Sequence, residues 1–298
     1  MRISIVTVCK NAETTIERTI KSVINQGYSD LEYIIIDGGS TDKTTDIIKK
    51  YSKHLRYWHS STDKGMYDAL NKGFSVASGD VLAWINSDDS YLPWTFRVVE
   101  NIFEKFPHVK WITGKQSWWK DGMLSRVDPF ATPQGIVKRG LACFDSGYRG
   151  IQQESTFWRK ELWDGVGCFP PDITYAGDYW LWTKFANVAP LVAVDVVLGG
   201  FTVRAGQQSE VFWPNYRAEI AKIRLKLLGN LPRIWRRNWN LCRMLLCVVP
   251  VRQMKLSLIK VLLGIDCVEW DCLYYDGGGK WLEVKENVLL PIEKMKLL

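Results

Sequence analysis

The stretch from residue 81 to residue 90 constrains the fold of this chain more than any other. It begins with five apolar residues that end at Ile85. The polar residues that follow at once are Asn86, Ser87, Asp88 and Asp89. An uninterrupted apolar run of this length is typical of a strand buried on both faces, as in a parallel sheet. Ligands bind at the carboxyl edge of such sheets, so the sequence predicts a binding site directly after this strand.

Two adjacent carboxylates repel each other unless a divalent cation or a donor-rich ligand lies between them. Asp88 and Asp89 therefore favour a metal and phosphate site. The alternative is that they form a turn and cap a helix that begins near Pro93. These residues alone leave both interpretations open.

Composition narrows the class of protein. The 298 residues suffice for one large α/β domain with an appendage, and 47% of them are hydrophobic, as in a globular protein. No apolar run reaches the roughly 18 residues that a membrane span needs, and the first residues do not resemble a signal peptide. The seven cysteines include no C-x-x-C pair, which favours reduced thiols and a cytoplasmic protein.

The first 85 residues alternate between strand and helix patterns. Strands are expected at 2–8, 31–36, 55–58 and 81–85, and helices at 16–24, 43–51 and 65–77. This order predicts right-handed βαβ crossovers and an α/β fold with a mostly parallel sheet and flanking helices. No G-x-G-x-x-G follows the first strand and no G-x-x-x-x-G-K-[ST] occurs, so dinucleotide oxidoreductases and P-loop enzymes lose their main support.

Further elements are expected after residue 90. They are a helix at 93–106, a strand at 109–113, an irregular segment to about 150, a helix from about 175 and an edge strand at 192–198. Within the irregular segment, Trp118 and Trp119 either stack on a sugar ring or pack under the loop, and packing is slightly favoured.

Asp37 is the first polar residue after the second strand, and two glycines follow it. Glycines let a backbone approach a ligand closely, and the carboxylate can accept hydrogen bonds from a nucleobase imide or a ribose hydroxyl. The alternative is a turn aspartate that stabilises its own loop.

Four motifs together carry a resemblance to a known family. They are Ser4-Ile5-Val6-Thr7-Val8-Cys9-Lys10-Asn11, Tyr33-Ile34-Ile35-Ile36-Asp37-Gly38-Gly39-Ser40-Thr41-Asp42, Asp63-Lys64-Gly65-Met66-Tyr67-Asp68-Ala69-Leu70-Asn71-Lys72-Gly73 and Asn86-Ser87-Asp88-Asp89. In this order and spacing they closely resemble the family 2 glycosyltransferases of the GT-A fold, specifically the bacterial branch that builds surface polysaccharides and glycolipids. The resemblance spans roughly residues 2 to 200.

The resemblance implies a role for each matching residue on the donor side. The residues implied to contact the nucleotide or its sugar diphosphate are Thr7, Asp37, Asp63, Lys64, Asn71, Asn86 and Ser87. Asp88 matches the last acidic position of the family's D-x-D motif and is implied to hold Mg²⁺ or Mn²⁺. The first position of that motif is Asn86, whose amide oxygen brings no charge.

On the acceptor side, the family carries an acidic general base at the place of Asp178, so this residue is implied to be catalytic. The family's commoner Glu-Asp pair is here Gly177-Asp178. Gln153, Glu154 and Trp180 are implied to line the acceptor site. The alternative for Asp178 is that it only caps its helix.

The implied activity is an inverting, metal-dependent transfer from a nucleotide-diphosphate sugar, with UDP- or dTDP-sugars favoured. The acceptor would be a glycan or a lipid-linked glycan. Two alternatives remain, namely a non-catalytic protein that binds sugar nucleotides or glycans, and a sugar-nucleotide pyrophosphorylase.

We expect a GT-A catalytic domain at 1–205, with a donor half at 1–90 and an acceptor half at 91–205. A basic helical region at 206–265 and a hairpin-like tail at 266–298 follow. Twelve basic and two acidic residues lie between Arg204 and Lys260. Residues 233–260 either contact an anionic membrane at its inner face or form an appendage with a solvated basic face. Nucleic acid is not expected as a partner, because no known binding motif accompanies the charge.

Overall fold

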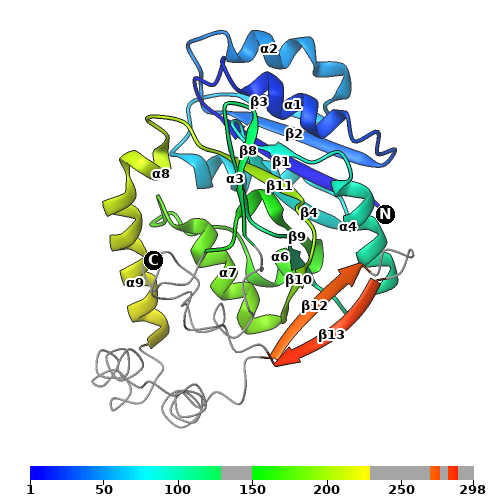
Figure 1. Cartoon of the computed structure of the whole chain (residues 1–298). Helices are drawn as coiled ribbons and strands as arrows, with labels where there is room; N and C mark the ends of the chain where they lie inside the picture. Colours follow the sequence, from blue (N-terminus) through cyan, green and yellow to red (C-terminus); the bar gives the residue numbers. More distant parts are fainter. Residues whose placement is uncertain (129–149, 229–268, 276–280, 288–298) are drawn as a thin grey trace.

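A computed structural model describes residues 1–128, 150–228, 269–275 and 281–287 of the chain (Figure 1). A nine-stranded sheet forms its centre. In spatial order the strands are β13 (Trp281–Asn287), β12 (Glu269–Tyr275), β10 (Leu191–Val194), β6 (Trp111–Thr113), β9 (Thr156–Arg159), β4 (Val81–Asn86), β1 (Ile3–Cys9), β2 (Leu31–Asp37) and β3 (Tyr57–Ser60). Neighbouring strands run parallel, except that β9 is antiparallel to both its neighbours and β13 to β12. The predicted α/β fold with a mostly parallel sheet is confirmed.

Helices flank this sheet (Figure 1). They are α1 (Ile16–Ile24), α2 (Thr44–Lys50), α3 (Met66–Val76), α4 (Thr95–Lys105), α6 (Lys160–Val166), α7 (Gly177–Val188), α8 (Gln208–Val211) and α9 (Trp213–Leu228), with 3₁₀ turns η1 (Ser52–His54) and η3 (Gln153–Ser155). In α1, Ile16, Ile20 and Val23 recur at helical spacing and are all fully buried. This spacing is why the sequence predicted a helix here.

The strands β1, β2 and β4 end together. Cys9 at the end of β1 pairs with Asp37, and Val8 pairs with Asn86 at the end of β4. Strand order reverses at β1, because β2 lies on one side of it and β4, which comes later in the chain, on the other. A crevice at the carboxyl ends is where ligands bind in sheets of this kind. The polar residues after β2 and β4 are thus brought to one edge.

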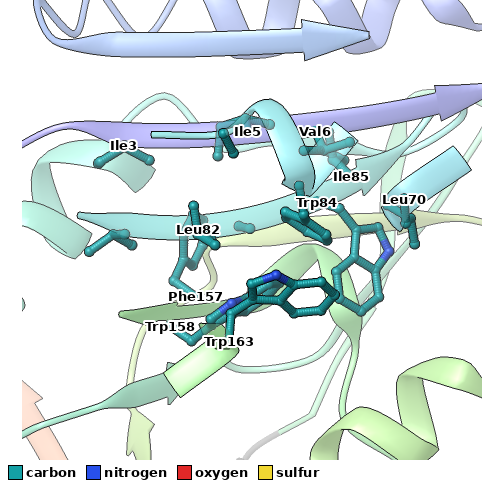
Figure 2. Close-up of a cluster of buried hydrophobic side chains, with 14 of the residues drawn as sticks. Ile3, Ile5, Val6, Leu70, Leu82, Trp84, Ile85, Phe157, Trp158 and Trp163 are labelled. Carbon is teal, nitrogen blue, oxygen red and sulfur yellow. The ribbon is translucent and has the colours of Figure 1, made fainter. Parts of the chain in front are cut away.

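Tryptophans fill the core beneath that edge. Trp84 of β4 and Trp158 of β9 lie against each other with ring centroids 5.5 Å apart (Figure 2). Trp182 of α7 stacks on Trp84 at 5.4 Å, with an angle of 8° between the ring planes. Aromatic pairs contribute about 0.5–1.5 kcal/mol each beyond the area they bury. This cluster fixes α7 against the sheet two residues below the polar end of β4.

A second, four-stranded sheet covers part of the segment that was expected to be irregular. Its strands are, in order, β5 (Ser90–Tyr91), β11 (Gly199–Thr202), β7 (Ser117–Lys120) and β8 (Met123–Val127). A Cβ atom at Gly200 would lie 2.4 Å from the Trp119 ring, and the Arg126 guanidinium lies 4.9 Å from the centre of the Trp118 ring. Both tryptophans therefore pack against the protein in this sheet.

The prediction of an edge strand at 192–198 is wrong. The strand β10 ends at Val194 and lies between β6 and β12. Its outer neighbour β12 comes from more than seventy residues later in the chain and pairs with it at Ala193 and Val194. No local pattern around β10 could reveal a partner that distant.

The strands β12 and β13 form an antiparallel hairpin in the region expected to be a hairpin-like tail. In the expected basic helical region, α8 and α9 are described, and residues 229–265 lie outside the described residues. The division into domains stays a prediction. Within the described part of the chain, no helix is long and apolar enough to cross a membrane.

Candidate active site

The residues after β4 form a tight turn closed by a hydrogen bond from the Asp89 amide to the Asn86 carbonyl, 3.2 Å. The Asp88 side chain is 17% exposed, and its Oδ2 accepts a hydrogen bond from Arg204 Nε at 2.8 Å. Arg18 donates to the Asp88 carbonyl oxygen at 2.6 Å. Two arginines from distant parts of the chain thus fix this turn at the carboxyl edge of the sheet.

The interpretation that Asp88 and Asp89 cap the following helix is wrong. The helix α4 begins at Thr95, the residue at its N-cap is Trp94, and no side chain caps it. The turn itself is present, but its carboxylates point to other partners.

Asn86 and Asp88 fit a divalent cation. The Asn86 Oδ1 atom is buried and has no hydrogen-bond partner in the described structure, which is costly unless a ligand or water completes it. An amide oxygen and a carboxylate are the hard oxygen ligands that Mg²⁺ and Mn²⁺ accept. Among the described residues no three His, Cys, Asp or Glu side chains gather into a metal cluster. Mg²⁺ is commonly held by one or two protein groups together with substrate phosphates and water, and this pair would suit that arrangement.

Asp37 is fully buried and stabilises its own loop. Its Oδ2 accepts hydrogen bonds from the Ser40 amide at 2.9 Å and from the Ser60 hydroxyl at 2.6 Å, and its Oδ1 accepts one from the Ser40 hydroxyl. This is the turn that the alternative interpretation expects. A contact between Asp37 and a nucleotide stays a prediction.

Asp63 and Lys64 lie between β3 and α3. A Cβ atom at Gly38 would lie 2.7 Å from Asp63 Oδ2, so the Asp63 carboxylate lies directly against the Gly38 backbone. The other oxygen of Asp63 accepts a hydrogen bond from the Gly65 amide at 2.9 Å, and Lys64 is exposed. The structure therefore brings Asp63 beside the loop that follows β2.

Thr7 and Asn71 have partners within the protein. Thr7 is fully buried, and its hydroxyl lies 3.0 Å from the Tyr33 hydroxyl. Both ends of the Asn71 amide bond to the backbone of Phe169, each at 2.9 Å. Ser87, by contrast, lies in the half-buried turn after β4. The nucleotide contacts predicted for these three residues rest on the resemblance alone.

Asp178 is the second residue of α7. The position before the helix is Ala176, and no side chain caps α7, so the interpretation of Asp178 as a cap is not observed. Burial raises the pKa of Asp178 to about 6, although hydrogen bonds from its surroundings oppose the rise. A carboxyl group with a pKa near neutrality is suited to accept a proton.

Gly177 explains why only one acidic residue stands at this place. A Cβ atom there would lie 2.4 Å from Tyr67 Cε1, so any side chain would collide with the ring. The Tyr67 hydroxyl donates to the Tyr175 carbonyl at 3.0 Å and accepts a hydrogen bond from the Asp178 amide at 3.4 Å. Tyr67 of α3 thus fills the space beside Asp178 and joins the donor half to α7.

Glu154 lies buried between the two sides of the site. It is 1% exposed, and neither carboxyl oxygen has a hydrogen-bond partner in the described structure. Burial raises its pKa to about 8, and the negative charges of Asp88 and Asp178 add to the rise. Because both carboxylates act on Glu154, it links the end of β4 electrostatically to the start of α7.

Asp89 belongs to the same buried group. Its oxygens accept hydrogen bonds from the Thr202 amide at 2.8 Å and from Gln153 Nε2 at 3.2 Å. Burial raises its pKa well above the ordinary value, with Glu154 and Asp88 adding to the effect. Gln153 and Glu154 therefore lie behind the Asp88 turn, and acceptor contacts for them stay a prediction.

Trp180 is half-buried on α7. Its ring lies 5.9 Å from that of Phe169, and Lys184 Nζ lies 5.6 Å from its centre. These contacts do not test whether Trp180 touches the acceptor, which stays a prediction.

Sequence reasoning missed three side chains that meet the site from later in the chain. They are Arg204 at Asp88, Tyr216 at Asp178 and Glu219 at the loop before α7. Each lies at least 38 residues from the group it contacts, so no local spacing could have indicated them.

The fold is an α/β fold of the GT-A type. A family model described as glycosyl transferase family 2 matches residues 4–156, about half of the chain. The chain therefore belongs to this family and is a glycosyltransferase, as the sequence motifs indicated.

Curated relatives of this chain are also glycosyltransferases. An uncharacterized glycosyltransferase of Mycobacterium tuberculosis is 29% identical over 212 residues, which cover 70% of this chain and 78% of the relative. A PGL/p-HBAD biosynthesis glycosyltransferase of Mycobacterium bovis is 36% identical over 90 residues, which cover 29% of this chain and 35% of the relative.

Solved structures share the fold. Staphylococcus aureus TarS residues 1–349 in complex with UDP-GlcNAc has a TM-score of 0.63 at 17% identity, covering 88% of this chain and 81% of that one. The Mycobacterium tuberculosis glucosyl-3-phosphoglycerate synthase in complex with Mn²⁺, UDP and its product has a TM-score of 0.51 at 18% identity, covering 78% and 81%.

Proposed function

We propose that this glycosyltransferase moves a sugar from a nucleotide-diphosphate sugar to an acceptor hydroxyl with inversion, and that it needs Mg²⁺ or Mn²⁺. The observation that carries the proposal is the pairing of Asp88 and Asn86 at the end of β4 with a carboxyl group, Asp178, whose pKa is raised to about 6. Asp88 and Asn86 suit a metal ion bound to a diphosphate, and Asp178 suits a hydroxyl that must lose its proton.

Asp178 on one side, and Asp88 with Asn86 on the other, have different roles in the reaction. Asp178 accepts the proton of the acceptor hydroxyl as its oxygen forms a bond to the anomeric carbon. The bond from that carbon to the diphosphate oxygen breaks, and the electron pair leaves with the nucleoside diphosphate. Attack on the face opposite the leaving group inverts the anomeric centre. Asp88 and Asn86 would hold the cation, which when bound offsets the negative charge of the diphosphate.

Arg204 and Arg18 both contact Asp88, the residue that would hold the cation. The Arg204 guanidinium already neutralises Asp88, and Arg18 holds the backbone of that turn. Asp88 would hold a cation only by releasing Arg204, because both would use the same carboxylate.

Relatives bear on the donor and on the acceptor. The TarS and synthase structures contain UDP-GlcNAc and UDP, which supports a UDP-sugar as donor, whereas a dTDP-sugar rests on the family resemblance alone. The Mycobacterium bovis relative is a PGL/p-HBAD biosynthesis glycosyltransferase, and a glycan or lipid-linked acceptor for this chain is our proposal.

Calorimetric titration with UDP, dTDP and GDP, each with and without Mn²⁺, tests the donor site. We expect one nucleotide to bind only with metal, and Asp88→Ala to abolish this binding. Asp178→Asn should bind the nucleotide normally and transfer sugar at a greatly reduced rate. Asp46→Asn, an exposed carboxylate on α2, is the matched control and should behave as the unaltered protein. Absence of nucleotide binding in the presence of metal would refute the proposal, and normal binding without any turnover would support the non-catalytic alternative.

Contact with a membrane is a proposal from the sequence alone, because residues 233–260 lie outside the described residues. Sedimentation with vesicles that contain an anionic lipid tests it. Changing Arg233, Arg236, Arg237 and Arg243 to Gln should release the protein from such vesicles. Unchanged binding of that variant would exclude this segment as the anchor.

A further inference from the structure

The helix α9 has a fixed place beside the start of α7. A small second core joins the two helices, formed by Ala176, Tyr179, Ile220 and Ile223. Arg224 Nε also donates a hydrogen bond to the Tyr179 hydroxyl at 3.3 Å. Side chains of α9 therefore meet the first turn of α7 in a defined geometry.

Glu219 of α9 holds the segment that leads into α7. Its carboxylate accepts hydrogen bonds from the amides of Thr174 at 2.9 Å, Tyr175 at 2.7 Å and Ala176 at 2.5 Å. Amides before a helix have no partner within the helix, and a negative charge is favoured at this end of its dipole. One carboxylate thus fixes three consecutive residues, and Asp178 follows two positions later.

Tyr216 lies three residues before Glu219, on the same face of α9. Its hydroxyl is 3.3 Å from Asp178 Oδ2 and 3.5 Å from Asp178 Oδ1. Its ring is stacked on that of Trp213, with centroids 5.5 Å apart and an angle of 15° between the planes. The hydroxyl therefore reaches the carboxylate from a ring that is itself held in place.

We propose that Tyr216 is a positioning residue, whose hydroxyl holds the Asp178 carboxylate in the orientation and charge state that proton transfer requires. This inference rests on the proposed function, which makes Asp178 the general base. It adds the helix after the catalytic domain to the active site, through a side chain that never has to touch the acceptor.

The physical reason is that rotation of a carboxylate about its last bond is only weakly restricted. A hydrogen bond from Tyr216 removes this freedom and leaves the other lone pairs for the acceptor hydroxyl. It also favours the charged form, and so opposes the rise that burial causes in the pKa of Asp178.

Other groups act on Asp178 from each side. The Tyr67 hydroxyl of α3 accepts a hydrogen bond from the Asp178 amide, while the negative charge of Glu219 on α9 faces the Asp178 carboxyl group. This charge disfavours ionisation of Asp178. Tyr216 opposes it with a side-chain hydrogen bond to the carboxylate.

The variant Tyr216→Phe removes the hydroxyl and keeps the stacked ring. Carboxyl titration by NMR, on protein carrying ¹³C-labelled aspartate, follows Asp178 directly and needs no substrate. The signal that disappears in Asp178→Asn identifies the residue. We expect the midpoint of Asp178 to rise by about half a pH unit or more in Tyr216→Phe, as loss of a hydrogen bond to a charged group predicts.

The matched control is Tyr51→Phe, which removes a tyrosine hydroxyl from another carboxylate, Glu17 Oε1, at 2.6 Å. It should leave the Asp178 midpoint unchanged. A midpoint in Tyr216→Phe that equals that of the unaltered protein, with native signals for the rest of α7, would overturn the inference. That failure is distinct from failure of the proposed function, because calorimetry with UDP and Mn²⁺ tests the donor site without Tyr216.

Discussion

Two buried glutamates lie at opposite edges of the same sheet, and their pKa values are shifted in opposite directions. Glu32 stands near the start of β2 and is 4% exposed, whereas Glu154 stands at the other edge, before β9, and is 1% exposed. Glu32 accepts hydrogen bonds from the Ser4 hydroxyl at 2.5 Å, the Ser78 amide at 2.6 Å and the Ser78 hydroxyl at 2.8 Å. Glu154 has no such partner in the described structure.

The difference shows that burial alone does not decide what a carboxyl group does. Burial opposes ionisation of Glu32, but the bonds from Ser4 and Ser78 and the charge of Arg2 outweigh it, so its pKa is lowered. Burial dominates at Glu154 and raises its pKa to about 8. A satisfied carboxylate stabilises the amino edge, whereas Glu154 is unsatisfied at the carboxyl edge, where a ligand would complete it.

The largest expected effect is on activity at the carboxyl edge. Asp178→Asn should lower the rate of sugar transfer by about 10²- to 10⁴-fold, because general-base catalysis contributes a factor of that size. Thermal unfolding should be nearly unchanged, since the residue replaced gains little from ionising there. A variant that keeps its transfer rate would remove Asp178 from the mechanism.

At the amino edge, the largest effect should be on stability. Glu32→Gln should lower the free energy of unfolding by about 3 kcal/mol at pH 7, because hydrogen bonds to a charged group are worth about 1.5–3 kcal/mol each. The transfer rate per folded molecule should not change. Urea unfolding monitored by tryptophan fluorescence measures the loss, and equal stability of variant and parent would contradict the contrast between the two edges.

The tight packing between Gly177 and Tyr67 can be tested separately from the charges at the carboxyl edge. Gly177→Ala should destabilise the protein by about 2 kcal/mol, because overpacking a filled site costs about 1–3 kcal/mol. Gly165 in α6 has nothing within 4 Å of its would-be Cβ and is the matched control. There the same change should stabilise by about 0.4–1 kcal/mol through the unfolded chain. Similar melting temperatures for the two variants would show that Tyr67 does not occupy the space.

The smallest effect is a change in how stability depends on pH. Glu154 has a pKa raised from 4.5 to about 8, so its burial costs nothing below pH 4.5 and costs progressively more up to pH 8. Glu154→Gln should therefore gain stability relative to the parent as pH rises from 4.5 to 8, and this advantage should be absent at pH 4.5. Glu32 has the opposite sign, since its stabilisation is present above pH 4.5 and is lost as pH falls through its lowered pKa. Thermal melts of Glu154→Gln and the parent at several pH values test this, and parallel pH profiles would contradict it.

The sequence predicted what depends on local pattern. The strands β1, β2 and β4 were readable as apolar runs that are buried on both faces, and the helix α1 because it buries one face at helical spacing. Asp88 and Asp178 were readable as candidates because each directly follows or begins such an element. The motifs that carry the family resemblance lie on these same segments.

What could not be predicted depends on distant contacts. The burial of Glu154 without a partner arises where η3 passes beneath Gly199, whose would-be Cβ lies 2.1 Å from the Glu154 carbonyl oxygen. The strand β11 pairs with β7 from far along the chain, and the local hairpin of β7 and β8 was missed because β8 shows no period of two. Tyr216 reaches Asp178 from a segment whose sequence shows mainly its basic charge.

The hairpin of β12 and β13 has a consequence for how the chain acquires its fold. The strand β12 covers the outer edge of β10, and Leu273 is fully buried there. During synthesis, the ribosome completes β10 long before β12 exists, so β10 is an uncovered sheet edge in the interim. Such edges are sites of wrong pairing with other chains. Synthesis of this chain therefore includes an interval in which β10 has been made but its partner β12 has not.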